Sequence, residues 1–538
     1  MKKSLIAGAV AALLTLPVLA AQVPEGTQLL PAAQQVFVRN IGTEPASIDP
    51  QMVEESAGSD VVNDLFEGLY TLDGNGKLQA AGALGYELDA TGTVYTFKLR
   101  PDAKWSNGEP VTAADYVYGW QRAADPKNAS NYAWFIELTG VANASDVVQG
   151  KQSPDALGIK ALDDYTLQIT LKNPVPFFLK TLSHYTTFPA PKATIEKFGH
   201  EWVKPANIVS NGAFALKEWT PNERLIAERN PHYWDNEHTV LNKVIYLEIV
   251  SDTAAYNRYR ASELHYTTYP LEQYQQIKRQ SPEELVSAPM LATYYYVFNT
   301  QRKPFDDVRV RKALSLAIDR DTITEKILGQ GQLSAFSLTP PSVDGFELKR
   351  PASELMSKEE RIKQAKALLG EAGYGPGKPL TVDILYNTNE GHKKIALAIS
   401  SMWKHNLGVK AELNNMEWKT MVSALNEGDF GVSRYSWNGD YNDASTFLDI
   451  MTSSSSANSG KWFNKKYDAL LAKAHDAKDP AERNRLYQQA EVLIDEEAPI
   501  APVYFYVKSR LLKPNVKGYP YQNPQDLVYA KDLYLTAQ

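Results

Sequence analysis

The pattern of apolar and polar positions is most regular in the second half of the chain. Between residues 357 and 369, Ile362, Ala365 and Leu369 recur at the spacing of an amphipathic helix, and Gly370 marks its end. The same pattern predicts strands at 380–386, 409–413, 430–437 and 500–507, and helices at 393–405, 417–425 and 480–496. Strands that alternate with helices of this length predict an α/β sheet with crossover connections.

The first half has shorter elements between frequent turn residues. The pattern predicts strands at 35–39, 94–99 and 244–250, and a helix at 253–260. Thr112 has the side chain of a helix N-cap, so a further helix is expected from there through Arg122, ended by Asp125-Pro126. The two halves together predict a large, mixed α/β protein of at least two lobes.

The first twenty residues have the pattern of a signal peptide. Lys2 and Lys3 form a positive start, residues 5–19 are an uncharged apolar run, and small or compact residues precede a cleavage point after Ala20. The alternative is a transmembrane anchor, but the run is shorter than the ~20 apolar residues that a bilayer requires. We therefore expect residues 1–20 to be removed and the exported protein to have no membrane anchor.

Composition narrows the expected class of protein and its location. The 538 residues include no cysteine, which excludes disulfides, thiolate metal sites, cysteine nucleophiles and a lipid-modified N-terminal cysteine. A formal net charge of −7 disfavours a nucleic acid partner. A signal peptide without a lipidation cysteine predicts a protein that diffuses freely in a bacterial periplasm, and we expect a monomer.

Motifs of the common exported enzymes are absent from the sequence. The chain has no Gly-x-Ser-x-Gly, no His-Glu-x-x-His, no Walker A loop and no Gly-x-Gly-x-x-Gly. No two of the eight histidines are four residues apart, so no local metal site is predicted. We expect a protein that is not an enzyme and has no cofactor or metal. The alternative is an exported peptidase or glycan hydrolase with an unrecognised site.

Aromatic residues are abundant, with 10 Trp, 30 Tyr and 17 Phe. Tyrosine combines a large apolar face with a polar tip, which suits a surface that binds varied ligands. Arg434 and Asp440 stand near the end of a predicted strand that closes at Gly439, and ligands of α/β folds bind at such sheet edges. Six extended residues span about 20 Å at most, so the two charges suit a short zwitterion, with structural salt bridges as the alternative.

Many short segments, spread over the whole mature length, resemble one protein family. They include Asp64-Leu65-Phe66-Glu67-Gly68-Leu69, Trp105-Ser106-Asn107-Gly108, Asn211-Gly212-Ala213, Val308-Arg309-Val310-Arg311, Glu417-Trp418-Lys419-Thr420 and Asp440-Tyr441-Asn442. On these residues the chain resembles the periplasmic oligopeptide-binding proteins of ABC importers, in the peptide and nickel-type solute-binding family 5. Phe298-Asn299-Thr300-Gln301 is similar to the murein tripeptide-binding branch.

The resemblance implies the large bilobal α/β fold of periplasmic solute-binding proteins, type II and cluster C, with an additional inserted domain. Domain I would be discontinuous and comprise residues 21–66, 190–291 and 508–538. Domain II would be the insertion 67–189, and domain III would be the α/β ligand-binding lobe 292–507. In this family two lobes close over an extended peptide, whose main chain pairs with strand edges.

The resemblance also implies roles for individual residues. Asp440 is expected to receive the α-ammonium group of the ligand, with Tyr132 nearby. Arg434 and His392 are expected to meet the C-terminal carboxylate of the ligand. The remaining expected ligand-binding positions are Glu54, Tyr295, Trp418, Trp437, Asn438 and Tyr506.

Two departures from the family pattern bear on the ligand. Leu328 and Leu425 stand where oligopeptide-binding relatives often have a lysine and an arginine. The loss at Leu425 removes a partner for the extra carboxylate of a murein tripeptide. The expected function is capture of short peptides and their delivery to an inner-membrane ABC permease. A murein tripeptide, a dipeptide or heme is the alternative ligand within the family.

Overall fold

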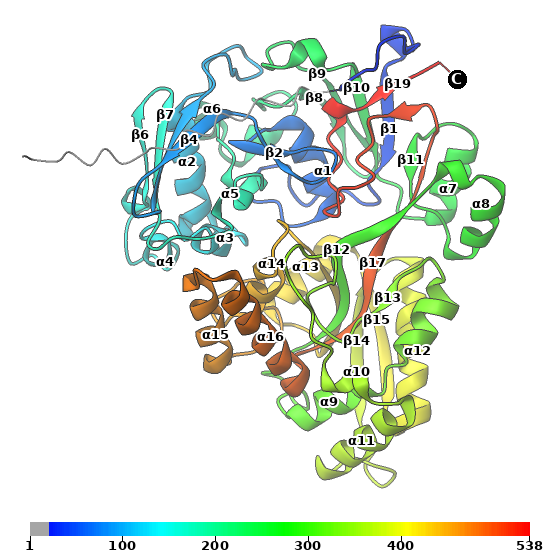
Figure 1. The fold of residues 1–538 in the computed structure, drawn as a ribbon. Coiled ribbons are helices and arrows are strands. Elements are labelled where there is room, and N and C mark those ends of the chain that lie inside the picture. Colours follow the sequence, from blue (N-terminus) through cyan, green and yellow to red (C-terminus); the bar gives the residue numbers. More distant parts are fainter. Residues whose placement is uncertain (1–20, 538) are drawn as a thin grey trace, which may run out of the picture.

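The computed structural model describes residues 21–537, so the predicted signal peptide lies outside the described residues. The chain forms an upper and a lower body in Figure 1, joined by strands β12 (Leu285–Phe298) and β17 (Ile500–Leu512). These two long strands pair antiparallel along most of their length. The two bodies are therefore connected by a continuous piece of sheet.

The largest sheet of residues 21–537 runs through both bodies. It has 11 strands in the order β15-β14-β16-β12-β17-β11-β1-β10-β9-β8, with β13 also paired to β17. In the lower body β14 is parallel to β15 and β16, whereas β12 is antiparallel to β16 and β17. The predicted mixed α/β architecture is confirmed.

The upper body contains two lobes. The N-terminal lobe is built on β1 (Val36–Asn40), β8 (Phe214–Thr220), β9 (Arg224–Arg229), β10 (Lys243–Leu247), β11 (Tyr266–Thr267), α1 (Ser56–Leu65), α7 (Asp252–Arg260), α8 (Tyr274–Gln280), β18 (Val516–Lys517) and β19 (Tyr534–Leu535). The small-sheet lobe has β4 (Ala83–Leu88), β5 (Val94–Leu99), β6 (Ile159–Asp163), β7 (Thr166–Thr170), α2 (Ala113–Ala124), α3 (Ala133–Leu138), α4 (Ala144–Val148) and α5 (Phe178–Thr181). Also in this body are β2 (Tyr70–Leu72), β3 (Leu78–Ala80) and α6 (Lys192–Phe198).

The lower body, called here the α/β lobe, holds the other elements. Its further strands are β13 (Leu333–Ser334), β14 (Thr381–Asn387), β15 (Lys410–Met416) and β16 (Val432–Asn438). Its helices are α9 (Val308–Leu316), α10 (Ala352–Leu355), α11 (Lys358–Glu371), α12 (Glu390–Leu407), α13 (Trp418–Glu427), α14 (Ser445–Leu448), α15 (Lys465–Asp476) and α16 (Pro480–Glu497).

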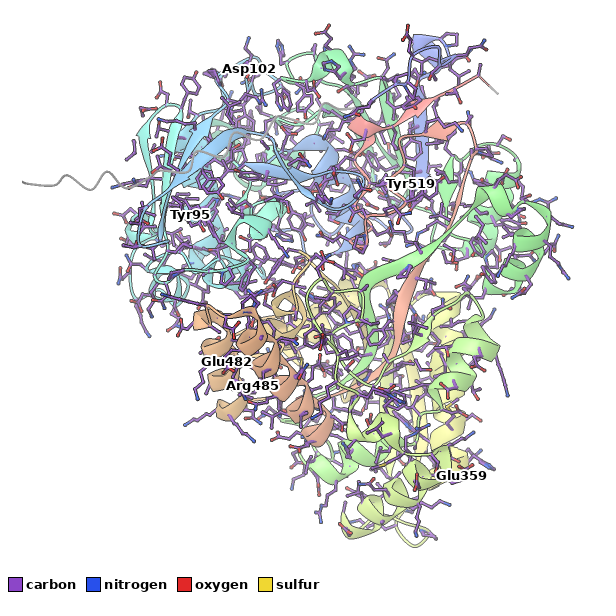
Figure 2. The ribbon with its side chains drawn as sticks, viewed as in Figure 1. Tyr95, Asp102, Glu359, Glu482, Arg485 and Tyr519 are labelled. Atoms are coloured by element: carbon purple, nitrogen blue, oxygen red, sulfur yellow. The ribbon has the colours of Figure 1, made fainter. Side chains whose placement is uncertain are left out.

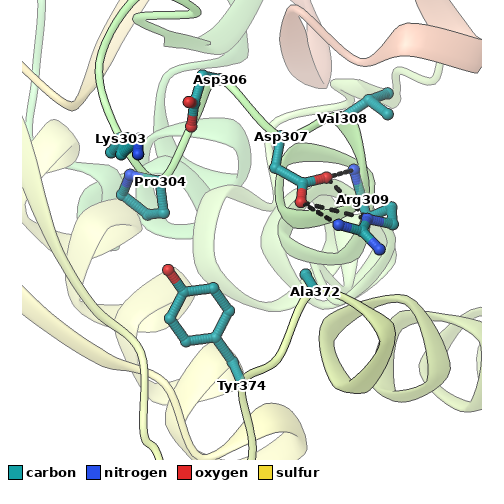
Figure 3. Close-up of a pocket in the computed structure, with 8 residues that line it drawn as sticks. All are labelled: Lys303, Pro304, Asp306, Asp307, Val308, Arg309, Ala372 and Tyr374. Carbon is teal, nitrogen blue, oxygen red and sulfur yellow. Dashed lines mark hydrogen bonds and ion pairs between the residues drawn. The ribbon is translucent and has the colours of Figure 1, made fainter.

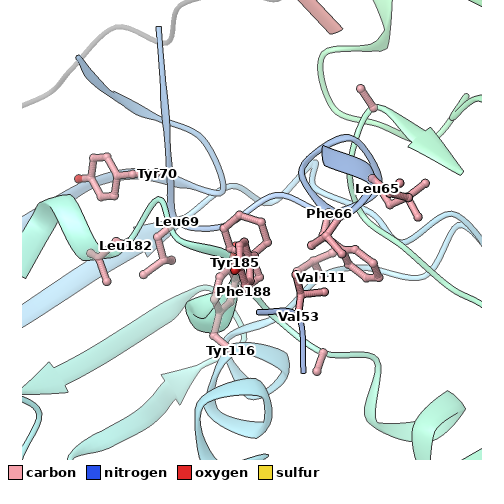
Figure 4. Packing of buried hydrophobic residues seen from close by; sticks show 14 of the residues in the cluster. Val53, Leu65, Phe66, Leu69, Tyr70, Val111, Tyr116, Leu182, Tyr185 and Phe188 are labelled. Carbon is pink, nitrogen blue, oxygen red and sulfur yellow. The ribbon is translucent and has the colours of Figure 1, made fainter. Parts of the chain in front are cut away.

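Buried apolar side chains hold the upper body together. Val53, Phe66, Tyr116 and Phe188 belong to one cluster that the N-terminal and small-sheet lobes share (Figure 4). Burial of aliphatic and aromatic side chains contributes roughly 1.5–3 kcal/mol each, so a shared core fixes these two lobes to one another. The upper body is expected to move as a unit.

A different apolar cluster crosses from the upper body to the α/β lobe. It joins Tyr132 and Phe135 of the small-sheet lobe to Tyr295, Trp437 and Tyr441 of the α/β lobe. Each of these side chains is buried. Because the cluster includes residues of both bodies, the lobes are closed against one another in this structure.

Most of the elements that the sequence pattern predicted lie within two or three residues of observed ones, whereas the other strands and helices, β12 among them, were not predicted. The strand expected at 94–99 is β5, and the helix expected after Thr112 is α2, where the Asp115 carboxylate accepts a hydrogen bond from the Thr112 N–H at 2.7 Å. The strand expected at 244–250 ends earlier, since β10 is Lys243–Leu247. The predicted end of the last long strand at residue 507 is wrong, because β17 continues to Leu512 with Lys508 fully buried.

The close contact of Gly212 with the end of α1 leads to a stability prediction. The Gly212 N–H donates to the Leu65 carbonyl at 2.7 Å, and a Cβ at this position would lie 2.6 Å from the Leu65 carbonyl carbon. Because that neighbour is main chain, we expect Gly212→Ala to lower the free energy of unfolding by about 1–3 kcal/mol. Urea denaturation measures the change. The matched control is Gly377→Ala, where a Cβ would meet nothing within 4 Å; equal stability of the two variants would contradict the prediction.

Candidate ligand-binding site

The Asp440 carboxylate lies where the small-sheet lobe meets the α/β lobe. It follows Gly439 just beyond β16, and its side chain is 7% exposed. The Tyr132 hydroxyl donates to Asp440 Oδ1 at 3.2 Å, and His184 Nε2 lies 3.3 Å from the same oxygen. The Thr446 hydroxyl donates to Oδ2 at 3.4 Å. No lysine or arginine of residues 21–537 forms an ion pair with this carboxylate, so an imidazole is its nearest titratable base.

Stacked rings hold the donors of Asp440 in place. The Tyr132 ring stacks on the His184 ring at 5.2 Å and on Trp437 at 6.4 Å, measured between centroids. Trp134 packs against Trp437, with ring centres 5.9 Å apart. Burial, followed by the charge of Asp440, raises the pKa of Tyr132 well above its ordinary value. The phenol therefore stays protonated and donates to the carboxylate.

Arg434 is a buried cation whose hydrogen-bond partners are all neutral. Its guanidinium donates to Asn387 Oδ1 at 3.2 Å, Ser436 Oγ at 3.3 Å and the Tyr506 hydroxyl at 2.9 Å. It also lies 4.8 Å from the centre of the Tyr294 ring. The side chain is buried, and its Nε has no hydrogen-bond acceptor within the described part of the chain. No carboxylate of residues 21–537 forms an ion pair with Arg434, so its charge is uncompensated.

His392 lies in the first turn of α12, beside Arg434. The N-cap Asn389 accepts a hydrogen bond from the His392 N–H at 3.1 Å, and the imidazole packs 5.6 Å from the Tyr294 ring. Burial of the ring, together with the nearby charge of Arg434, holds the pKa of His392 well below its usual 6.5. The imidazole is therefore neutral at neutral pH and can accept or donate one hydrogen bond.

Tyr435 connects the two charged ends electrostatically. Burial raises the pKa of its phenol, the charges of Glu54 and Asp440 raise it further, and Arg434 lowers it. Its hydroxyl is therefore within electrostatic range of all three groups. Glu54 accepts a hydrogen bond from Asn131 Nδ2 at 3.1 Å, and burial raises the pKa of the Glu54 carboxyl.

The other expected site residues are Tyr295, Trp418 and Asn438. Tyr295 on β12 packs edge-on against Tyr435, with ring centres 6.0 Å apart. Trp418 begins α13, and its buried indole Nε1 has no hydrogen-bond acceptor among the described residues. Asn438 is exposed, and its Nδ2 donates to Ser56 Oγ of the N-terminal lobe at 3.1 Å. The structure thus brings Asp440, Tyr132 and Trp437 together at one end, and Arg434, His392 and Tyr506 at the other.

The sequence reading missed three side chains that contact Asp440. The Thr446 hydroxyl donates to its carboxylate, His184 Nε2 lies within ion-pair distance of it, and Gln525 Nε2 donates to its main-chain carbonyl at 3.0 Å. Thr446 follows Asp440 closely in sequence, so a local search could have found it. His184 and Gln525 come from distant segments, and no motif marks either residue.

Further contacts close the small-sheet lobe onto the loop that carries Asp440. Lys180 Nζ donates to the Asn442 carbonyl at 2.6 Å, and the Phe177 ring stacks on Tyr441 with centres 5.4 Å apart. Ser456 Oγ donates to the Asn131 carbonyl at 2.7 Å. The candidate site is therefore covered on several sides by contacts between the two bodies.

A separate surface pocket of about 550 Å³ lies at the start of α9, where Asp307 and Arg309 form an ion pair at 2.6 Å (Figure 3). Its lining includes none of the expected site residues.

Within residues 21–537, no helix has the length and apolarity that crossing a bilayer requires, and no cluster of three or more metal-ligating side chains forms. Arg434 on β16 and Asp440 just beyond it, with the residues around them, remain the candidate site.

Residues 77–459 match the family described as bacterial extracellular solute-binding proteins, family 5, middle region. The chain belongs to this family. Its family 5 relatives include the periplasmic oligopeptide-binding protein OppA of Salmonella typhimurium, which is 47% identical over 538 residues, covering 99% of this chain and 98% of OppA. The periplasmic murein peptide-binding protein MppA of Escherichia coli is 46% identical, covering 96% of each chain. The probable deoxycholate-binding protein YgiS of Escherichia coli is 47% identical, covering 97% of each.

Solved structures of family 5 agree with the fold and with the closed arrangement. The Escherichia coli murein tripeptide-binding protein MppA matches with a TM-score of 0.92 at 44% identity, covering 97% of this chain and 100% of MppA. The unliganded open form of MppA matches with a TM-score of 0.68 at 45% identity, covering 96% and 99%. Identity is nearly the same in the two comparisons, so the lower score reflects a different arrangement of the lobes.

Burial is the larger cause of the low pKa of His392, and the further contribution of the Arg434 charge can be tested directly. Arg434→Met removes the positive charge beside the imidazole, so protonation becomes less unfavourable. We expect the pKa of His392 to rise toward its usual 6.5, without reaching it because the ring stays partly buried. A ¹H–¹³C NMR titration, assigned with His392→Gln, measures this pKa. Arg485→Met on the exposed face of α16 is the control, and an unchanged pKa in Arg434→Met would contradict the explanation.

Proposed function

We propose that this family 5 protein captures short peptides with free termini and delivers them to an inner-membrane ABC permease. The proposal depends mainly on one observation: within the described residues the buried Arg434 guanidinium has no carboxylate partner, and the Asp440 carboxylate has no lysine or arginine partner, with only the His184 imidazole within ion-pair distance. A buried charge without a partner is unfavourable. A zwitterionic ligand supplies an ammonium group for one end and a carboxylate for the other.

Similarity to relatives does not choose among ligands, because proteins named for oligopeptides, murein peptide and deoxycholate are all 46–47% identical to this chain. The chemistry of the site does discriminate. Deoxycholate and heme carry carboxylates but no ammonium group, so they would leave Asp440 uncompensated. A peptide of ordinary composition compensates both ends.

The ligand's extra charges provide a second criterion. A murein tripeptide has a carboxylate beyond the one at its C-terminus, and Leu328 and Leu425 are buried among apolar side chains. Neither position supplies a cation for such a group. We therefore favour short peptides of ordinary composition over murein peptide as the ligand.

Capture requires that the ligand stabilise the closed arrangement more than the open one. The contacts of Tyr132, His184 and Lys180 with the 438–442 loop join the two bodies, so a ligand that neutralises Asp440 and Arg434 stabilises the closed arrangement. Desolvation offsets much of the attraction at each ion pair, so these pairs set orientation more than affinity. Indole N–H groups of Trp418 and Trp437 without internal acceptors are available to the ligand's carbonyl groups. Nothing in this mechanism breaks a covalent bond.

The proposal includes a cellular setting and a domain division. The protein is a periplasmic monomer, released by cleavage after Ala20. Domain I comprises 21–66, 190–291 and 508–538, domain II comprises 67–189, and domain III comprises 292–507. The divisions at 291/292 and 507/508 fall inside β12 and β17, which supports a hinge within the strands that connect the two bodies.

Recognition of the ligand's amino terminus is tested by Asp440→Asn. We expect this variant to bind trialanine at least about tenfold more weakly, because the ligand's ammonium group would be desolvated without a charged acceptor. Binding of N-acetyl-trialanine, which has no ammonium group, should change less than about twofold. Isothermal titration calorimetry measures both.

The control for this experiment is Asp102→Asn, at a carboxylate that is 61% exposed at the outer edge of the upper body (Figure 2). Equal losses for the free and acetylated peptides would argue against the role of Asp440. Binding of deoxycholate or murein tripeptide without binding of trialanine would contradict the peptide proposal.

Recognition of the carboxyl terminus is tested by Arg434→Met. We expect at least about tenfold weaker binding of trialanine, whereas trialanine amide, which has no terminal carboxylate, should bind the variant and the unmodified protein alike. The matched control is Arg485→Met, on the surface of α16 beside Glu482 (Figure 2). A variant that still prefers the carboxylate over the amide as strongly as the unmodified protein would contradict this role.

A further inference from the structure

Side chains hold both main-chain polar groups of Asp440. Its N–H donates to Thr446 Oγ1 at 2.9 Å, and its carbonyl oxygen accepts from Gln525 Nε2 at 3.0 Å. Thr446 belongs to the same lobe, but Gln525 lies in the C-terminal segment that follows β17 and returns to the upper body (Figure 1). Gln525 is thus a contact between the upper body and the main chain of the candidate ammonium-binding residue.

The loop that carries Gln525 is itself held firmly. Asn523 is buried, and its Oδ1 accepts a hydrogen bond from the Gln525 N–H at 2.9 Å. Asp526 has a φ of 58°, a left-handed conformation that aspartate tolerates better than most residues. Its carboxylate lies 3.4 Å from Lys508 Nζ and 3.9 Å from Arg510 on β17. The Gln525 side chain therefore extends from a fixed loop.

The same loop is tied to the strand that connects the two bodies. The Leu291 N–H on β12 donates to the Pro524 carbonyl at 2.7 Å, and the Leu291 carbonyl accepts from the Gly439 N–H at 2.7 Å. One residue of β12 thus bridges the loop of Gln525 and the loop of Asp440. Loop 523–526, strand β12 and residues 439–440 form one hydrogen-bonded unit where the lobes join.

We propose that Gln525 is a positioning residue that sets the direction of the Asp440 side chain and thereby the preference for a free amino terminus. This inference depends on the proposed role of Asp440 as the ammonium acceptor. Gln525 acts through the main-chain carbonyl of Asp440 rather than by touching the ligand. With the carbonyl held, the Cα–Cβ bond of Asp440 has a fixed direction, and both carboxylate oxygens keep their present partners.

The experiment compares two probes, trialanine and N-acetyl-trialanine, with the mature full-length chain. The measured quantity is the ratio of the two dissociation constants, acetylated over free. We expect this ratio to be about ten or more in the unmodified protein and to fall at least threefold in Gln525→Leu. The fall should come from weaker binding of the free peptide, with the acetylated peptide changed less than about twofold. Because Leu and Gln are both uncharged, the charge of the site is the same in the variant.

Two further variants make the test decisive. Gln276→Leu, at an exposed glutamine on α8, should leave the ratio unchanged. Asp526→Asn keeps a residue that tolerates positive φ but removes the charge that binds Lys508, and so loosens the loop that carries Gln525. We expect a smaller fall in the ratio than in Gln525→Leu. This variant provides the test if Gln525→Leu does not fold. An unchanged ratio in both loop variants, or equal weakening of both peptides, would overturn the inference. Absence of any discrimination in the unmodified protein would instead contradict the proposed function on which it depends.

Discussion

The site depends on two buried groups of opposite charge, Arg434 without a carboxylate partner and Asp440 without a lysine or arginine partner among the described residues. Arg434 has three neutral hydrogen-bond partners and an aromatic ring but no carboxylate, and Asp440 has a phenol, a hydroxyl and an imidazole but no lysine or arginine. Such an arrangement is unfavourable in an empty closed protein and favourable once a ligand brings the opposite charges. The zwitterionic ligand that we propose follows from this balance rather than from the shape of a cavity.

The fold supplies the geometry for this constraint. Strand β16 carries Arg434, and the loop after it carries Asp440, so one segment sets the spacing of both ends. The other contacts come from the upper body: Tyr132, His184 and Lys180 from the small-sheet lobe, and Gln525 from the C-terminal segment. The partners of Arg434 belong to one lobe, whereas those of Asp440 come together only when the lobes meet. In the proposed function, closure and recognition of the amino terminus are thereby linked.

The sequence predicted the parts of this arrangement that depend on local pattern. Arg434 and Asp440 lie in a single strand-and-turn segment, as expected, but the sheet edge expected for them is wrong for Arg434, which lies inside β16 between β14 and β12. Strand β12 was not predicted, because it is buried on both faces from Met290 to Phe298 and so lacks the alternation of a half-buried strand. The end of β17 was misplaced because a lysine normally marks the surface, whereas Lys508 is buried against Asp526. His184 and Gln525 reach Asp440 from distant segments, and only tertiary structure brings them together.

The most direct measurement for the central claim is a crystal structure of the protein with trialanine. The account predicts closed lobes, with the peptide's ammonium group within hydrogen-bonding distance of the Asp440 carboxylate and its terminal carboxylate at the Arg434 guanidinium. A peptide bound with the opposite polarity, or bound elsewhere while both side chains keep the contacts they have here, would contradict it.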